Sequence, residues 1–320
     1  MCDSSSPLGG EDSKARRACE PLAALGEGYC DGPREAPLSA LPGISPSRGE
    51  ISASSVALFI PGHLKKFKLA LFERIGATIQ AAGGRMIKGD VKALAALPDT
   101  IVPIVGCTPE LRPLIEGWRK SGRRWIYWDR GYARRVFATD LPTGADGGFY
   151  RWHSGSFQLQ AVRALPDDRW KALKVDVWPW QRTGRHIVVA EPSATYERFH
   201  GIEGWTQRTI ERLKVLTDRP LIIRDKEMQR IGRKLHEDLK GAHCLVTHGS
   251  NAAVEAAIMG CPVFVHQDSA ASLIGRCDLG RIEEPFYPDR QPWLNALAYS
   301  QFDERELVDG TLWRLLDGPG

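Results

Sequence analysis

No run of eighteen apolar residues occurs in the sequence, and a helix that crosses a bilayer needs about that many, so we expect no transmembrane segment. The beginning of the chain, Met1-Cys2-Asp3-Ser4, lacks the basic-then-apolar order of a secretory signal peptide. The seven cysteines form no Cys-x-x-Cys pair, and this odd number fits neither a disulfide framework nor a zinc knuckle. These absences favour a cytoplasmic protein with free thiols.

A strong charge of one sign is also absent. The formal net charge is +4 over 320 residues, which by itself indicates no particular class of partner. What the sequence contains is typical of a folded globular protein: 42% hydrophobic residues, 26% charged residues and ten tryptophans. The chain is long enough for two α/β domains of ordinary size.

The first 52 residues differ from the rest of the chain. They are rich in Ser, Gly, Pro and Ala and show no sustained apolar periodicity, so they bury too little surface to offset the entropy of ordering. We expect residues 1–52 to form a disordered tail. A short helix over 14–25 is the alternative.

From residue 53 onward, short apolar runs that end in Gly, Pro or polar residues alternate with amphipathic stretches, which is the pattern of an α/β protein. The second series of runs is apolar without interruption, as expected for parallel strands covered on both faces. The predicted strands are 56–60, 101–105 and 125–128 in the first half, and 186–190, 220–223, 244–247 and 262–265 in the second half.

Two parallel sheets in two domains follow from this pattern. Residues 140–184 hold many Gly, Pro and aromatic residues and no convincing long strand, so we place the boundary near 183. A helix over 205–216 belongs to the second domain. The predicted organisation is a first domain at 53–183, a second domain at 184–302, and a closing amphipathic helix within 303–320.

The most informative segment is 241–265, which predicts a strand, a glycine-containing turn, a helix, a glycine stop and a strand. Gly249 and Ser250 allow a tight turn, Ser250 or Asn251 caps the helix, and Gly260 ends it. The N–H groups at the start of this helix lie at the carboxyl edge of the sheet, where the helix dipole favours an anion. A diphosphate suits this position.

Glu255 follows Asn251 by four residues, or about 6 Å along the helix axis. Helical side chains lean towards the N-terminus, so the carboxylate reaches the turn and is placed to accept the hydroxyls of a ribose. Among its apolar neighbours an unpaired carboxylate is costly. Glu255 therefore needs a partner.

The stretch from His248-Gly-Ser-Asn-Ala-Ala-Val-Glu255 to the Gly-x-Pro at 260–262 resembles the donor-site segment of GT-B glycosyltransferases, closest to the capsule-polysaccharide biosynthesis type. The resemblance implies two Rossmann-like domains whose parallel sheets face a cleft. It also implies that His248, Gly249, Ser250 and Asn251 bind the donor phosphates and that Glu255 binds hydroxyls of the nucleotide-sugar. Non-hydrolysing nucleotide-sugar epimerases share this architecture.

Further donor contacts are expected from the loops after neighbouring strands. Arg224 and Lys226 lie where the capsule-type transferases carry a basic segment, so either could neutralise the diphosphate; solvated charges are the alternative. His266 and Gln267 follow the last strand and border the same edge, where they could hold sugar hydroxyls or cap a loop.

The first domain offers two candidate general bases. His63 follows the first strand and has an ordinary pKa near neutrality, although a solvated loop histidine is the alternative. Asp129 is predicted to end a buried strand at the carboxyl edge of the sheet, where working residues gather. Asp129 is the leading base, and a salt bridge to Arg130 or Arg134 is the competing interpretation.

Eight Lys or Arg residues lie between 112 and 135, interleaved with Trp118, Trp125, Tyr127, Trp128 and Tyr132. Such a mixture suits a polyanionic acceptor such as DNA, with arginines on phosphates and aromatic rings under bases or sugar rings. A solvated face of a helix over 109–122 is the alternative. The expected acceptor-binding residues are Arg123, Arg124, Arg130, Arg134 and Arg135.

The segments 128–132, 150–158 and 290–299 are similar to those of uncharacterised bacteriophage proteins, which implies modification of viral DNA or of a glycan. His153, in the second of them, is interpreted as a structural histidine. No Asp-x-Asp triplet follows residue 52, which argues against a metal-dependent transferase. The sequence thus predicts a metal-independent glycosyltransferase with a nucleotide-sugar as co-substrate and no other cofactor. A non-catalytic nucleic-acid-binding protein or a sugar-nucleotide epimerase are the alternatives, and the oligomeric state is left open.

Overall fold

The computed structural model describes residues 56–61, 66–81, 83–89, 103–105, 111–135, 148–225, 231–303, 305–306 and 309–316. The expected tail at 1–52 lies outside the described residues, and so do His63 and Lys226. No helix within the described ranges is long and apolar enough to cross a bilayer.

The second half of the chain contains a four-stranded sheet in which every neighbouring pair is parallel. All four predicted runs form strands, in the order β7-β6-β8-β9. Because β6 lies between β7 and β8, the strand order reverses between β6 and β8, and α/β sheets bind ligands at such a switch point. The strands are β6 (His186–Ala190), β7 (Leu221–Arg224), β8 (Ala242–Thr247) and β9 (Val263–Val265).

Helices cover both faces of this sheet. The helix predicted over 205–216 is confirmed as α6 (Trp205–Leu216), which packs with η5 (Leu279–Arg281) against one face. On the other face lie α9 (Asn251–Ile258) and α10 (Gln291–Tyr299). The described residues of this half also form α5 (Ala194–His200), α8 (Leu235–Leu239) and η4 (Ala270–Leu273).

The first half of the chain forms a parallel pair, β1 with β2, and most of a second four-stranded sheet of order β10-β5-β4-β3. The strand β10 of this sheet comes from the C-terminal part of the chain. In that sheet β3 is parallel to β4, whereas β5 is antiparallel to both β4 and β10. The strands are β1 (Ala57–Pro61), β2 (Arg85–Gly89), β3 (Pro103–Val105), β4 (Ile126–Arg135), β5 (Gly148–Ser154) and β10 (Gln301–Phe302). The helices are α1 (Lys66–Ala81), α3 (Arg112–Lys120), α4 (Asp168–Leu173) and α12 (Thr311–Leu315).

The expectation of two purely parallel sheets is therefore right for the second half and wrong for the first. The region 140–184 contains the seven-residue strand β5, which sequence patterning missed. Its side chains alternate between an apolar core, reached by Trp152, and a face where Arg151 and His153 are buried. Buried polar residues on that second face hide the strand from a hydrophobicity pattern.

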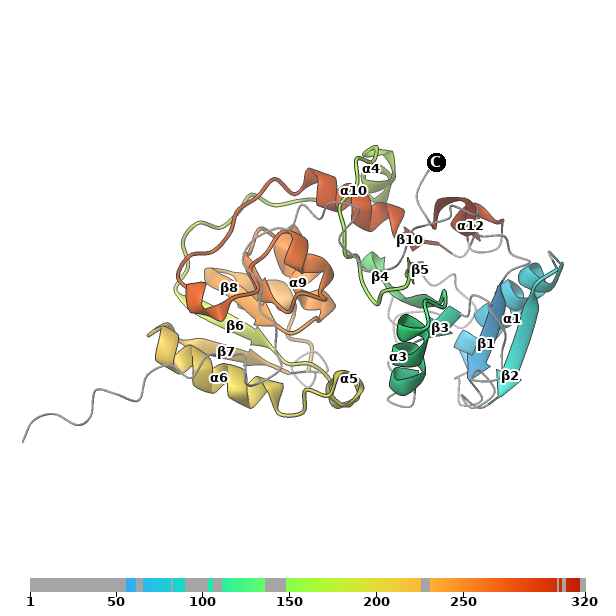
Figure 1. Ribbon diagram of the computed structural model, residues 1–320. Helices are drawn as coiled ribbons and strands as arrows, with labels where there is room; N and C mark the ends of the chain where they lie inside the picture. The colour runs from blue at the N-terminus through green and yellow to red at the C-terminus, as the bar shows by residue number, and fades with distance from the viewer. Residues whose placement is uncertain are drawn as a thin grey trace, which may run out of the picture.

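The C-terminal part of the chain returns to the first half. Gln301 and Phe302, which the expected boundary assigns to the second domain, pair with β5. Of the helix expected within 303–320, the structure describes α12, whose Leu312 and Trp313 join the core formed by β1, α1, β4 and β5. Figure 1 shows α12 beside β10 and on the same side of the molecule as α1.

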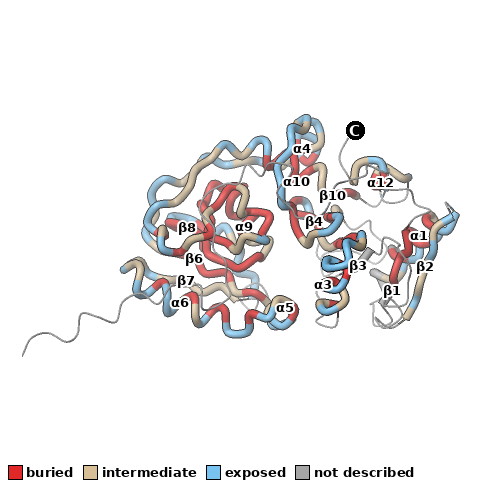
Figure 2. Tube along the Cα trace, in the orientation of Figure 1, coloured by how far each residue is buried: buried red, intermediate tan, exposed pale blue. Residues whose placement is uncertain are grey.

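One hydrophobic cluster contains residues of both halves. Tyr132 and Ala133 of β4 pack in the same cluster as residues of α9, α10 and the parallel sheet. In Figure 1 the helices α4 and α10 lie between the two sheets, and Figure 2 shows the buried residues concentrated in β8 and α9. The turn before α9 consequently lies close to the first half of the chain.

Candidate functional site

The turn that links β8 to α9 lies at the switch point of the parallel sheet. The Thr247 hydroxyl donates a hydrogen bond of 2.7 Å to the Ala190 carbonyl, which ties the end of β8 to the end of β6. Ser250 caps α9, because its Oγ accepts a hydrogen bond from the Ala252 amide at 3.3 Å. Among the described residues, the N–H groups of Ser250 and Asn251 have no acceptor. These are the amides that the turn offers to an anion.

Glu255 faces this turn, as its spacing from Asn251 predicts. The Asn251 amide nitrogen donates to Glu255 Oε1 at 3.2 Å and to the Tyr132 carbonyl at 3.0 Å. Because Tyr132 belongs to β4, Glu255 and Asn251 lie on the side of α9 that faces the first half. Asn251 Oδ1 is buried without a hydrogen-bond partner among the described residues, so this oxygen is an open acceptor.

Gln158, in the segment that follows β5, holds the turn from the first half. Its Nε2 donates to the Gly249 carbonyl at 2.8 Å, and its Oε1 accepts from the Ala270 amide at 2.9 Å. The side chain is buried. Gln158 thus connects the turn before α9 with the start of η4.

Three histidines gather at the carboxyl ends of β8 and β9 and on α5. His248 and His266 stack with ring centroids 4.3 Å apart, His200 lies 5.8 Å from His248, and the Tyr196 hydroxyl is 3.2 Å from His248 Nδ1. Burial, together with His266 and His200, lowers the pKa of His248 to about 2. Burial and then Arg112 lower the pKa of His200 to about 4. At neutral pH both rings are uncharged polar surfaces.

This histidine group does not form a metal centre. Within the described ranges, no three His, Cys, Asp or Glu side chains come together in a way that could hold a metal ion. The Gln267 carbonyl accepts a hydrogen bond from the Ser272 hydroxyl at 2.9 Å.

Asp129, the leading candidate base, lies inside β4 and not at its end. The parallel partner β3 stops opposite Trp128, but β4 continues past Asp129 to Arg135. Its carboxylate accepts hydrogen bonds from the Tyr127 hydroxyl at 2.9 Å and the Arg130 amide at 2.8 Å. With 32% of its side chain exposed, the carboxylate still reaches solvent.

The salt bridge that competes with this role is present, but its cation is Arg151 and not Arg130 or Arg134. Arg151 Nη2 lies 3.4 Å from Asp129 Oδ2 in the neighbouring strand β5. Burial by itself lowers the pKa of Arg151, but the Asp129 carboxylate, together with Tyr132 and Tyr127, raises that pKa above its ordinary value. Arg151 also lies over the Tyr132 ring, 5.2 Å from its centroid.

A buried pair, Tyr132 and His153, continues this polar face. The Tyr132 hydroxyl is 2.7 Å from His153 Nε2 and accepts a hydrogen bond from the Leu159 amide at 2.8 Å. Burial raises the pKa of Tyr132 to about 12, while burial and then Arg151 lower the pKa of His153 to about 3. His153 is a buried, hydrogen-bonded residue, in agreement with its structural interpretation.

Arg224, at the end of β7, is held by an ion pair. Its guanidinium is paired with the fully buried Asp238 carboxylate of α8 and donates to the Arg233 carbonyl at 2.8 Å. Arg224 is therefore not a simple solvated charge, and its contact with a donor diphosphate stays a prediction. Lys226, the second expected cation, is outside the described residues.

In the basic segment 112–135, the aromatic side chains do not lie at the surface with the arginines. All five aromatic side chains that interleave with the arginines, Trp118, Trp125, Tyr127, Trp128 and Tyr132, are buried in the core. They cannot stack on the bases of a bound nucleic acid, so that part of the prediction is wrong. The reason is the fold: these residues lie on both faces of β4 and on the inner face of α3.

The arginines of the segment 112–135 differ in their exposure to solvent. Arg124 and Arg134 are exposed, and Arg130 is half-buried. Arg123 packs over the Trp118 ring, 4.9 Å from its centroid. The side chain of Arg135 is outside the described residues.

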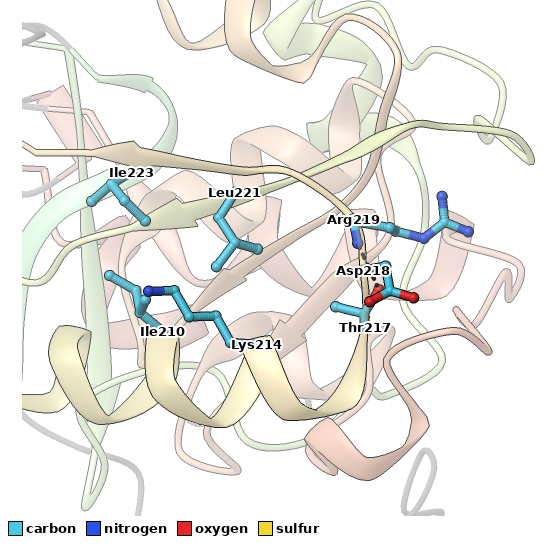
Figure 3. Close-up of a pocket in the computed structure, with 7 residues that line it drawn as sticks. All are labelled: Ile210, Lys214, Thr217, Asp218, Arg219, Leu221 and Ile223. Carbon is cyan, nitrogen blue, oxygen red and sulfur yellow. Dashed lines mark hydrogen bonds between the residues drawn. The ribbon is translucent and has the colours of Figure 1, made fainter.

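A surface pocket of about 460 Å³ lies apart from the candidate site, between α6 and β7 (Figure 3). Lys214, Asp218 and Leu221 are among its lining residues. The guanidinium of Arg219 points away from Leu221 in Figure 3, because it is bound to Glu283. None of the predicted site residues lines this pocket.

Comparisons with known proteins leave the family of the chain open. No protein-family model matches the sequence, and no curated protein matches it. Among solved structures, the chain is similar to the beta Kdo 2,4 transferase of KpsC from Thermosulfurimonas dismutans, with a TM-score of 0.46 and 13% identity over 81% of this chain and 98% of that one. It is also similar to the beta Kdo 2,7 transferase of the same KpsC, with a TM-score of 0.43 and 11% identity over 80% of this chain and 99% of that one. Both TM-scores are below 0.5, so these likenesses carry no argument about activity.

Proposed function

We propose that this chain is a glycosyltransferase that moves a sugar from a nucleotide-sugar donor to a hydroxyl acceptor. Residues from 184 onward carry the donor side, and the sheet of the first half carries the acceptor side. The donor diphosphate binds at the turn from His248 to Asn251, and Glu255 accepts hydrogen bonds from donor hydroxyls.

The observation that carries this proposal is the position of Glu255. Its carboxylate lies one helical turn from two open amides, at the switch point of a parallel sheet, and it is held there by Asn251. The open amides suit an anion, and the nearby carboxylate suits hydroxyl groups. A ligand that fits both has a phosphate next to a polyhydroxylated ring. A nucleotide-sugar has this chemistry.

The first half supplies the candidate acceptor side. The acceptor hydroxyl attacks the anomeric carbon, the bond from that carbon to the diphosphate oxygen breaks, and the nucleoside diphosphate leaves with the electron pair. Asp129 is proposed to take the hydroxyl proton, because part of its carboxylate is exposed. The amides of Ser250 and Asn251 stabilise the leaving diphosphate without a metal ion.

The exposed Arg134 is proposed to contact an anionic acceptor, which can be a surface glycan or DNA. The burial of the neighbouring aromatic rings excludes the stacking of either bases or sugar rings on these side chains, so the proposed acceptor contact is electrostatic. Cytoplasmic location is part of the same proposal, because nucleotide-sugars are made there.

Thermal shift with a panel of UDP-, GDP-, CMP- and TDP-sugars tests the donor site. One of these donors is expected to raise the Tm of the wild-type protein, because a ligand of the folded state stabilises it. Replacing Glu255 by Ala or Gln is expected to weaken the binding of that donor by at least about tenfold, since two donor hydroxyls lose an ionised acceptor.

Glu211→Ala is the matched control, because Glu211 is an exposed glutamate on α6 that contacts Gln207. Its donor affinity should equal that of the wild type. Wild-type protein that responds to none of the four donor classes, or a Glu255→Ala variant with unchanged affinity, would overturn the proposed function.

A further inference from the structure

Gln158 is a candidate positioning residue that the sequence did not reveal. Both ends of its amide are used, one by the Gly249 carbonyl at 2.8 Å and the other by the Ala270 amide at 2.9 Å. The Ala270 contact fixes the orientation of the amide, because an N–H group must face Oε1 and a carbonyl must face Nε2. The hydrogen bond from Gln158 to Gly249 is therefore directional.

This hydrogen bond orients one of the two open amides of the turn. In a trans peptide the C=O and the following N–H lie in one plane and point in opposite directions. With the Gly249 carbonyl directed at Gln158, the N–H of Ser250 must point to the opposite side of the same peptide. That N–H has no acceptor among the described residues.

The turn is also held by packing. A Cβ added at Gly249 would lie 2.3 Å from the Tyr196 hydroxyl and 3.2 Å from Gln158 Nε2, so these two side chains enclose the Gly249 backbone. A rotation of the peptide between Gly249 and Ser250 would break the Gln158 hydrogen bond. Without Gln158, the packing alone does not define which way the amide points.

We propose that Gln158 is a positioning residue that fixes the peptide between Gly249 and Ser250, so that the Ser250 N–H presents to the anionic group of the donor. The inference rests on the proposed function for the identity of the ligand. Because Gln158 follows β5, it also means that the donor turn is completed by the first half of the chain. Preorganised amides bind an anion more tightly than amides that must first be ordered.

Two variants distinguish the hydrogen bond of Gln158 to Gly249 from its hydrogen bond with Ala270. Gln158→Met removes both hydrogen bonds and keeps a long unbranched side chain, whereas Gln158→Glu keeps an acceptor for Ala270 and loses the donor for Gly249. The matched control is Asn295→Leu, since Asn295 is another buried amide with both ends used, by the Leu165 carbonyl and the Gln291 side chain. All three variants lose buried hydrogen bonds, but only those at 158 touch the turn.

The first measurement is ¹⁵N relaxation of the backbone amides in the unliganded full chain. In both variants at 158 the order parameters of the Ser250 and Asn251 amides should fall from the value of a rigid backbone, about 0.85, towards about 0.6, because the peptide before Ser250 is no longer held. Equal order parameters at these two amides in Gln158→Met and Asn295→Leu would overturn the positioning role.

The second measurement is the affinity for the sugar nucleotide that stabilises the wild type, by calorimetry. Both variants at 158 should bind it about tenfold more weakly, and Asn295→Leu should bind it normally. Unchanged affinity in Gln158→Glu overturns the inference. If the wild type binds none of the four donor classes, the proposed function fails, while the relaxation measurement still decides whether Gln158 orients the turn.

Discussion

Gly249 is the residue at which the turn tolerates no side chain. A Cβ there would lie 2.3 Å from the Tyr196 hydroxyl oxygen, far inside van der Waals contact. Gly249→Ala should therefore destabilise the protein by about 1–3 kcal/mol, as overpacking of a tight site does. Tyr196→Phe removes the clashing oxygen, at the cost of about 1 kcal/mol for its hydrogen bond to His248.

A double-mutant cycle checks this prediction by urea unfolding. The double variant Gly249→Ala with Tyr196→Phe should be less destabilised than the sum of the two single variants, because the alanine methyl occupies the space that the hydroxyl leaves. Additive effects would show that the strain at Gly249 arises elsewhere.

At the scale of single residues, local spacing predicts Ser250 and Glu255 well. The cap at Ser250 and the approach of Glu255 to the turn both follow from positions within one helix. Gln158 and Tyr196 were missed because they meet the turn from 91 and 52 residues away in the sequence. Nothing in the pattern of a single chain encodes such tertiary contacts.

At the scale of elements, the bulge in β4 depends on the short strand β10. The register of β4 against β5 shifts between Arg130 and Arg135, and the Gln301 side chain fills the gap. Gln301 Oε1 accepts hydrogen bonds from the Tyr132 amide at 2.8 Å and the Ala133 amide at 3.0 Å. Both amides are buried.

Gln301→Leu would leave two buried N–H groups without an acceptor. Each unsatisfied group costs about 1–3 kcal/mol, so we expect a loss of about 2–6 kcal/mol in the free energy of unfolding. Because Tyr132 also accepts from Asn251, the variant should weaken donor binding as well. Urea unfolding measures the first effect. The exposed Gln160, replaced by Leu, provides the control and should change the free energy of unfolding by less than about 0.5 kcal/mol.

The elements that could be predicted are those with a one-dimensional signature. The strands β6 to β9 are continuous apolar runs between turn residues, and all four were predicted. The strand β5 alternates apolar residues with Arg151 and His153, which the fold buries in a polar network with Asp129 and Tyr132. The antiparallel return through β5 and β10 consequently escaped the sequence analysis.

At the scale of the whole molecule, the two halves are joined by a core and by polar contacts that converge on Tyr132. Its side chain packs with α9 and α10, its hydroxyl binds His153 and Leu159, and its carbonyl binds Asn251. Neutral histidines lie on both sides of this junction: the buried His153 in the first half, and the half-buried His200 and the buried His248 in the second. Their protonation links the stability of the whole fold to pH.

The sign of this dependence follows from the lowered pKa values. In the unfolded chain these histidines bind protons near pH 6.5, whereas in the folded protein their pKa values are about 3, 4 and 2 for His153, His200 and His248. Below pH 6.5 the unfolded state therefore binds more protons than the folded state. The stability is complete above that pH and falls as the pH decreases, by about 1.4 kcal/mol per pH unit for each histidine.

Unfolding in urea at pH 7.5, 6.0 and 5.2 should show this loss, with a limiting slope of about 4 kcal/mol per pH unit from the three rings. Carboxyl groups such as Glu283, whose pKa Arg219 lowers from 4.5, contribute only at lower pH, so the window isolates the histidines. His248→Gln should reduce the slope by about a third, since a neutral side chain replaces one of three rings that resist protonation. A free energy of unfolding that stays constant from pH 7.5 to 5.2 would mean that the rings accept protons in the folded state, and the junction would then be open to water.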